Sequence, residues 1–234
     1  MLNSDLSMPL THGLLHATIG RHFVAHGTAP TIAQLSAALG TEAATIADAL
    51  RALADDHGVV LHPTSGEIWA MHPFSAAPTA FWVESGGRGW WGNCAWCALG
   101  IVALLHADAT ITTTLGGESV QIVLQIRDGV VTPADLCVHF PIPMARAWDN
   151  VTYTCSTMLV FASAAAVDVW CIRHAIPRGN VQSLATVWAF AQVWYGRHLD
   201  PQWTKWTTVE AQAVFDRFGL TGPIWALPTS TERF

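Results

Sequence analysis

Apolar residues recur every three or four positions through the first 56 residues, which is the spacing of amphipathic helices. Leu15, Ile19 and Phe23 share one helical face. Thr31 is a good N-cap, and Gly40 is typical of the residue that ends a helix. The pattern predicts helices over residues 14–23, 31–40 and 41–56.

Two short extended runs follow, at residues 59–62 and 67–71, and the sequence ProThrSerGly between them has the chemistry of a hairpin turn. The order of helix, helix and hairpin predicts a winged helix-turn-helix-like domain over residues 1–75. Such a unit often binds DNA, so a metal-responsive regulator is one candidate function.

The charges of this unit argue against nucleic acid as a partner. The second helix of the pair, residues 41–56, has a single cation, Arg51, and four acidic residues, which are Glu42, Asp48, Asp55 and Asp56. The hairpin contains no lysine or arginine. A recognition helix must approach phosphates, and this one would be repelled. We therefore expect a structural or dimerising unit.

After residue 75 the pattern changes to that of a mixed α/β (α+β) domain. Residues 73–90 are rich in Pro and Gly and predict a connector. Helices and strands alternate beyond it, so we expect a mixed sheet in a domain over residues 76–202, followed by a Trp-containing extension, 203–234. The predicted helices cover residues 93–105, 164–174, 181–199 and the segment from Thr207 to Gly219; the predicted strands cover 109–115, 119–127, 135–140 and 152–161.

Composition indicates the class of protein and its expected location in the cell. Of the 234 residues, 51% are hydrophobic and 12% charged, so the chain can bury a large core. Charged residues interrupt its apolar runs before the ~20 residues that a membrane span needs. The first residues also lack the basic start and apolar centre of a signal peptide. We expect a cytoplasmic protein with no membrane partner.

Five cysteines are present, and in a cytoplasmic protein most of them are expected to be reduced. Cys94 and Cys97 stand at the start of a predicted helix, with Asn93 as its cap. Backbone N–H groups and the helix dipole favour a thiolate there. Gly100, one turn later, either leaves an open notch beside Cys97 or permits close helix packing. Cys137 and Cys171 lie in apolar runs and are predicted to be core residues.

Three segments resemble the organomercurial (alkylmercury) lyase family. The first is Cys94-Ala-Trp-Cys-Ala-Leu-Gly100, where the family has an aromatic residue, Ala-Trp-Cys-Ala-Leu and then Asp. The second is Cys155-Ser-Thr-Met-Leu-Val-Phe-Ala-Ser163, and the third is the aromatic helix that closes on Arg-His-Leu199. The resemblance covers most of residues 15–199 in the same order.

This resemblance implies a carbon–mercury lyase in which Cys97 and Cys155 bind mercury and a proton completes the cleavage, since soft sulfur ligands suit a soft metal. The family's aspartate falls on Gly100, which carries no proton. One interpretation gives its role to a substitute: Cys94, water in the Gly100 notch, or another acid. A second is cysteine chemistry on a non-mercury substrate. A third is binding of Hg, Cu or Zn by Cys94, Cys97 and Cys155 without catalysis.

The implied partners are a small-molecule substrate or metal ion and a thiol reductant, and no cofactor is required. The chain is also rich in tryptophan, and Trp203, Trp206 and Trp225 stand in the extension. This extension either covers the site or packs at the interface of a homodimer. We predict that His16 and its neighbouring N-terminal histidines lie on the surface.

Overall fold

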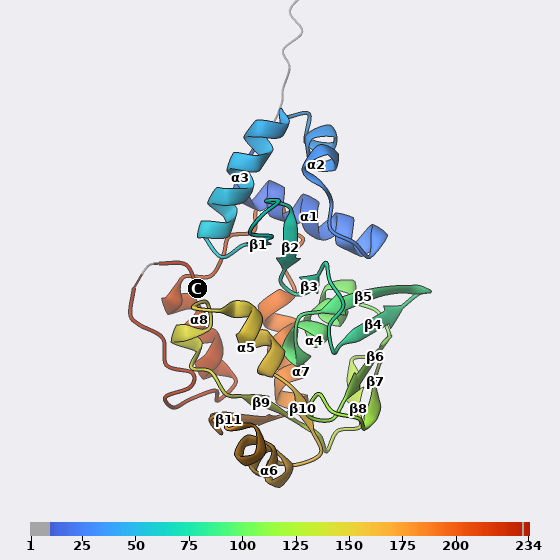
Figure 1. Ribbon diagram of the computed structural model, residues 1–234, viewed down its shortest axis with the longest axis vertical. Helices are drawn as coiled ribbons and strands as arrows, with labels where there is room; N and C mark the ends of the chain where they lie inside the picture. Colours follow the sequence, from blue (N-terminus) through green and yellow to red (C-terminus); the bar gives the residue numbers. More distant parts are fainter. Residues whose placement is uncertain (1–9, 231) are drawn as a thin grey trace, which may run out of the picture.

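The computed structural model describes residues 10–230 and 232–234, so residues 1–9 of the predicted first domain lie outside the described part. Helices and antiparallel strands alternate through this part, which confirms the predicted α+β class (Figure 1). Within these residues, no helix is both long enough and apolar enough to cross a lipid bilayer.

Three helices form one end of the molecule, and a short antiparallel hairpin follows them, in the predicted order. Thr31 and Gln34 form a capping box, and Gly40 ends the same helix in the left-handed region, as expected. The third helix begins at Ala43 with Glu42 as its N-cap. These elements are α1 (His12–His26), α2 (Ile32–Leu39), α3 (Ala43–Asp55), β1 (Val60–Leu61) and β2 (Ile68–Met71).

The larger sheet has eight strands in the order β1-β2-β3-β5-β4-β6-β7-β8. Every pairing between its strands is antiparallel, so the prediction of a mixed sheet is wrong. The predicted connector is also wrong, because residues 73–90 contribute to three strands of this sheet. The strands are β3 (Phe74–Ser75), β4 (Trp82–Ser85), β5 (Arg88–Gly92), β6 (Ala109–Thr114), β7 (Gln121–Arg127) and β8 (Val130–Thr132).

A smaller antiparallel sheet has the order β10-β9-β11, and α6 lies beside it (Figure 1). Its strands are β9 (Cys137–Phe140), β10 (Val160–Phe161) and β11 (Asn180–Ser183), and α6 is Ala164–His174. The first residues of the predicted helix 181–199 therefore belong to a strand. The helix itself, α7, is Leu184–Tyr195.

The segment around Cys155 differs most from its prediction. Residues 152–161 were expected to form a strand, but Val151–Thr157 is a helix, α5, and only Val160–Phe161 is extended. Asn150 caps this helix by accepting a hydrogen bond from the Tyr153 N–H. The cap and tertiary packing thus override the strand preference of the β-branched residues.

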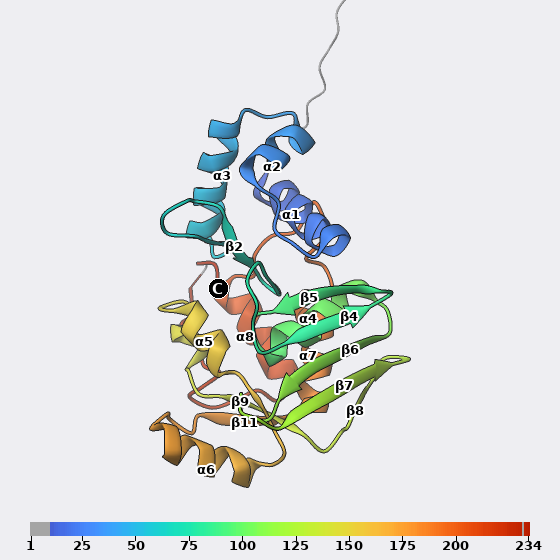
Figure 2. The same ribbon diagram turned by 45° about the vertical axis from the view of Figure 1, so that its right-hand side comes forward.

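The centre of the molecule is α4 (Ala95–Leu105), which packs between the larger sheet and α7 (Figure 2). Each of its first ten residues, 95–104, is buried. A helix that is apolar on all sides requires packing partners on all sides. This burial fixes the start of α4, where Cys97 stands.

The C-terminal extension packs against the rest of the chain. Its helix α8 (Thr208–Arg217) contacts α7, and the chain ends close to the hairpin of β1 and β2 (Figures 1 and 2). Trp203 and Trp225 are both buried within this one chain. The extension therefore covers part of the protein's own core.

We expect Thr207→Ala to lower the free energy of unfolding by about 1 kcal/mol. Thr207 and Glu210 form the predicted capping box of α8, with Oγ1 accepting from the Glu210 N–H at 3.2 Å. Urea unfolding measures the change. The exposed Thr204→Ala is the matched control, and equal stability of the two variants would contradict the assigned cap.

Candidate active site

A pocket of about 590 Å³, including its open mouth, lies where α4, α5 and α7 meet the N-terminal helices and the C-terminal extension. Its walls are mainly aromatic and apolar, with three cysteines and several histidines among them. No aspartate or glutamate is among the described residues that line it. Such a pocket suits a small apolar ligand that thiols recognise.

Cys97 and Cys155 meet in this pocket. Cys97 stands in the first turn of α4 and Cys155 in α5, and both are buried. Their sulfurs and a ring nitrogen of His72 all lie within 4.8 Å of one another. A metal with bonds to sulfur of ~2.3 Å can bridge sulfurs at such a separation. The structure thus brings together the two cysteines that the sequence singles out.

His72 is the third member of this group and was not predicted from the sequence. Its Nε2 lies 3.4 Å from Cys155 Sγ. Burial lowers the pKa of His72, so the imidazole is neutral. His72 stands between β2 and β3, more than twenty residues before Cys97, and no motif around it indicates a ligand.

Cys94, the other thiol considered at sequence level, is the N-cap of α4. Its Sγ accepts a hydrogen bond from the Cys97 N–H at 3.3 Å. Asn93, predicted to be the cap, instead donates to the carbonyls of Pro73 and Phe74. The group of three ligand atoms therefore contains His72, while Cys94 fixes the backbone beside it.

The three thiols differ in pKa. Burial alone would raise the pKa of Cys97, but hydrogen bonds with Cys155 and Cys94 and the neighbouring His72 and Tyr195 hold it well below its usual value. Burial raises the pKa of Cys94. Hydrogen bonds to Cys94 and Cys97, and then burial, raise the pKa of Cys155. The surroundings therefore favour a thiolate on Cys97 over one on Cys94 or Cys155.

The predicted notch at Gly100 is absent, because the ring of Tyr195 fills it. A Cβ at Gly100 would lie 2.3 Å from Tyr195 Cδ2 and 2.6 Å from Cε2. The alternative prediction, that Gly100 permits close helix packing, is the one that the structure supports. Water in an open notch at Gly100 is accordingly excluded as a proton carrier.

Tyr195 itself lies at the thiol site, where its hydroxyl is 3.4 Å from Cys97 Sγ. Burial, followed by the charge of Cys97, raises the pKa of Tyr195 well above its usual value, so the phenol keeps its proton. No motif around Tyr195 indicates a role in the site. Only the contact with Cys97 identifies Tyr195 as a site residue.

The opposite wall joins α1 to the C-terminal extension. His16 stacks on Trp203 with ring centroids 3.8 Å apart, and its Nδ1 lies 3.1 Å from the His198 carbonyl. His16 is buried, which corrects its predicted place on the surface. Burial lowers its pKa to about 3, so this ring is neutral.

Lys205 adds a cation to this wall. Its Nζ lies 4.4 Å from the centroid of the Trp148 ring and donates to the His57 carbonyl at 3.1 Å. Burial lowers the pKa of Lys205 to about 7, an effect that the negative charge of Cys97 partly offsets.

We expect Lys205→Met to stabilise the protein by roughly 2–4 kcal/mol at pH 6. The unfolded chain binds a proton on Lys205 between pH 7 and its usual pKa near 10.5, whereas the folded chain does not. The wild type therefore gains stability as the pH rises above 7, and the advantage of the variant shrinks there. Urea unfolding at several pH values measures this, with the exposed Arg88→Met as control. A constant difference across that range would refute the shifted pKa.

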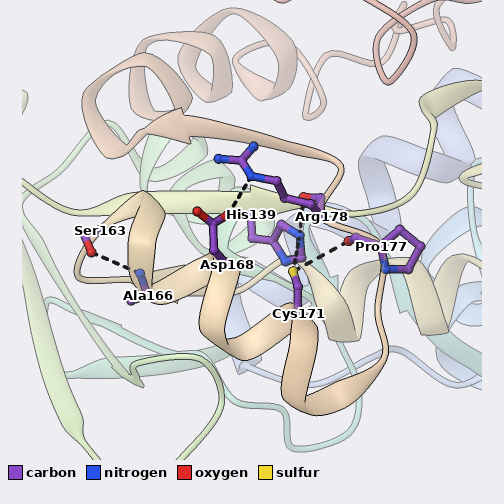
Figure 3. Close-up of polar contacts among 7 residues, drawn as sticks. All are labelled: His139, Ser163, Ala166, Asp168, Cys171, Pro177 and Arg178. Carbon is purple, nitrogen blue, oxygen red and sulfur yellow. Dashed lines mark hydrogen bonds and ion pairs between the residues drawn. The ribbon is translucent and has the colours of Figure 1, made fainter.

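A second cysteine–histidine contact joins Cys171 of α6 to His139 of β9 (Figure 3). His139 Nε2 is 2.8 Å from the Arg178 carbonyl, so this nitrogen carries the proton and cannot accept one from Cys171 Sγ, 3.6 Å away. Burial raises the pKa of Cys171. This pair is structural, in agreement with the prediction for Cys171, and Cys137 is likewise buried.

Fold and site together define an α+β protein with a buried centre of two thiols and an imidazole. The family model for alkylmercury lyase (MerB) matches residues 74–196, which is more than half of the chain. The chain belongs to the alkylmercury lyase family. No curated protein matches it.

Ten chains of solved structures match this protein. One is the mercury-bound form of MerB2, with 21% sequence identity and a TM-score of 0.63. The match covers 81% of this chain and 97% of that one. At this identity, the likeness shows a shared fold.

Proposed function

We propose that this protein cleaves carbon–mercury bonds by protonolysis, with Cys97 and Cys155 as the mercury ligands. The observation that carries the proposal is the group of two sulfurs and an imidazole nitrogen within 4.8 Å of one another in an aromatic pocket. Membership of the alkylmercury lyase family supports it. The solved relative with this fold was crystallised with mercury bound.

Cys97 acts first in this proposal. A thiolate is the nucleophilic form of cysteine, and the low pKa of Cys97 supplies it. The sulfur binds the mercury of R–Hg–X, and X leaves with its electron pair. The aromatic wall accommodates the organic group R, which stays bonded to mercury. The product of this step is a Cys97–S–Hg–R adduct.

Cys155 acts second. Its sulfur binds the same mercury and loses its proton, for which the neutral His72, with Nε2 at 3.4 Å, is placed as acceptor. A second sulfur weakens the bond from mercury to carbon. The carbon leaves with the bonding pair and takes up a proton. The balance is Cys97–S–Hg–R + Cys155–SH → R–H + Cys97–S–Hg–S–Cys155, and external thiols then remove the mercury.

Soft-metal binding without turnover is the second candidate function. The three-donor group of His72, Cys97 and Cys155 favours it, since thiolate and imidazole suit Hg(II), Cu(I) and Zn(II). It predicts tight stoichiometric binding of Hg(II) and no release of hydrocarbon.

The test is purified protein with phenylmercury and excess thiol, with benzene as the measured product. Repeated turnover is expected, together with its loss in Cys97→Ala and Cys155→Ala. Cys171→Ala is the matched control, because it removes a buried thiol outside the pocket. Benzene release no faster than in the two site variants would refute the lyase proposal and favour metal binding alone.

A further inference from the structure

Protonolysis needs an acid close to the carbon that leaves mercury, and the pocket restricts the choice. Its described lining contains no carboxylic acid. The resemblance places the family's acid at Gly100, which has no side chain. Among the protein's own groups, the candidates for the proton donor are therefore the hydroxyl, thiol, imidazole and ammonium groups of the pocket.

Most of these groups have other partners. His16 Nδ1 lies against the His198 carbonyl, and Lys205 Nζ donates to the His57 carbonyl. The sulfur of Cys94 accepts from the backbone at Cys97. His72 Nε2 faces Cys155. Cys94 and Cys155 also form hydrogen bonds with the Cys97 sulfur, but Cys155 is needed as a mercury ligand, and Cys94 Sγ is held against the backbone as the N-cap of α4.

The Tyr195 hydroxyl also faces the Cys97 sulfur. It lies 3.4 Å from Cys97 Sγ, on the last residue of α7, and the ring is buried. The same ring occupies the space into which a side chain at position 100 would extend, with contacts from 2.3 to 2.9 Å to the added Cβ. Tyr195 therefore stands where an acid on residue 100 would stand, and it reaches the sulfur that holds mercury.

We propose that Tyr195 is the catalytic proton donor of this protein, in the place of an acid at position 100. This inference rests on the proposed lyase function. As the carbon–mercury bond breaks, its electron pair takes the phenolic proton, and R–H forms. The tyrosinate then takes up a proton again. That proton is the one that Cys155 loses to His72 when its sulfur binds mercury. The overall balance of the reaction is therefore unchanged.

The test follows the two steps separately in the Tyr195→Phe variant. Intact-mass spectrometry measures formation of the phenylmercury adduct on Cys97, and gas chromatography measures benzene. We expect the adduct to form at nearly the wild-type rate and then accumulate, with benzene release slowed by about 10²–10⁴-fold. The matched control is Tyr153→Phe, at the chain's other tyrosine, which is exposed and lies outside this pocket.

A rescue variant provides a second test, which depends on a gain of benzene release and not on its loss. In Gly100→Asp combined with Tyr195→Ala, the carboxyl group gains the space that the ring vacates. We expect it to release benzene at least about tenfold faster than Tyr195→Ala alone. Failure of this rescue would argue against the assigned position of the donor.

The other outcomes separate this inference from the proposed function. Benzene release from Tyr195→Phe at the wild-type rate would overturn the role of Tyr195 and leave the lyase function standing. Slower adduct formation with normal cleavage of the adduct would show that Tyr195 only positions the Cys97 thiolate. A wild-type protein that forms the adduct but releases no benzene would refute the lyase function itself.

Discussion

The Cys97→Ala variant is expected to release benzene from phenylmercury at least about 10³-fold more slowly than the wild-type protein. Its surroundings lower the pKa of Cys97 and favour the thiolate, so its loss removes the proposed nucleophile as well as a mercury ligand. Cys155→Ala is expected to lose release to a similar extent but to keep the Cys97 adduct, because only the second sulfur is missing. Benzene release and intact mass distinguish the two blocks.

Cys171→Ala serves again as the control for loss of a buried thiol. Because Cys97 is the proposed nucleophile, we expect Cys97→Ala to form no phenylmercury adduct within the pocket. An adduct of unchanged yield in that variant would assign the first step to Cys94 or Cys155. Equal benzene release by Cys155→Ala and wild type would show that one thiol suffices.

The Gly100→Asp variant is expected to lose about 3 kcal/mol or more of its free energy of unfolding and to gain no activity. A Cβ at this position would lie 2.3 Å from Tyr195 Cδ2, inside a helix whose surroundings are buried. The carboxyl group would also lose its hydration without a partner of opposite charge. Thermal and urea unfolding measure the loss, together with benzene release.

The control for Gly100→Asp is Gly40→Asp. Gly196 is not suitable, because a Cβ there would lie 2.6 Å from the Gln192 carbonyl oxygen. Gly40 has open space around its Cβ position but a positive φ of 61°, which gives the cost of backbone strain without overpacking. A stable Gly100→Asp protein with a faster release of benzene would contradict the tight packing of Tyr195 against α4.

Local signals predicted much of the fold. Several helix ends were predicted correctly. Thr31 and Thr207 are N-caps, as their hydroxyl groups predict, and Gly40 ends its helix in the left-handed region, as glycine allows. Prediction failed where distant contacts decide the structure. Residues 152–157 prefer a strand by composition, yet the Asn150 cap and packing around the pocket make them helical. Residues 73–90 join a sheet in which β3 pairs with the earlier strand β2 and β4 pairs with the later strand β6.

The residues of the candidate site show the same contrast between local sequence signals and distant contacts. Cys97 stands out because a short motif places it at a helix start, and the resemblance adds Cys155. His72 and Tyr195 have no such local signal, since each becomes a site residue through one contact with a residue over eighty positions away. The close packing of the Tyr195 ring on Gly100 could not be predicted from the spacing of residues on α4 alone.

The most direct test of the central claim is a single turnover with phenylmercury, in which no external thiol is added. The two cysteines and the bound proton suffice for one cleavage. The account predicts one equivalent of benzene per chain and one mercury atom retained by the protein, bound to two sulfurs as seen by X-ray absorption. Mercury retained with its phenyl group intact, and no benzene above the level of the Cys97→Ala/Cys155→Ala double variant, would contradict it.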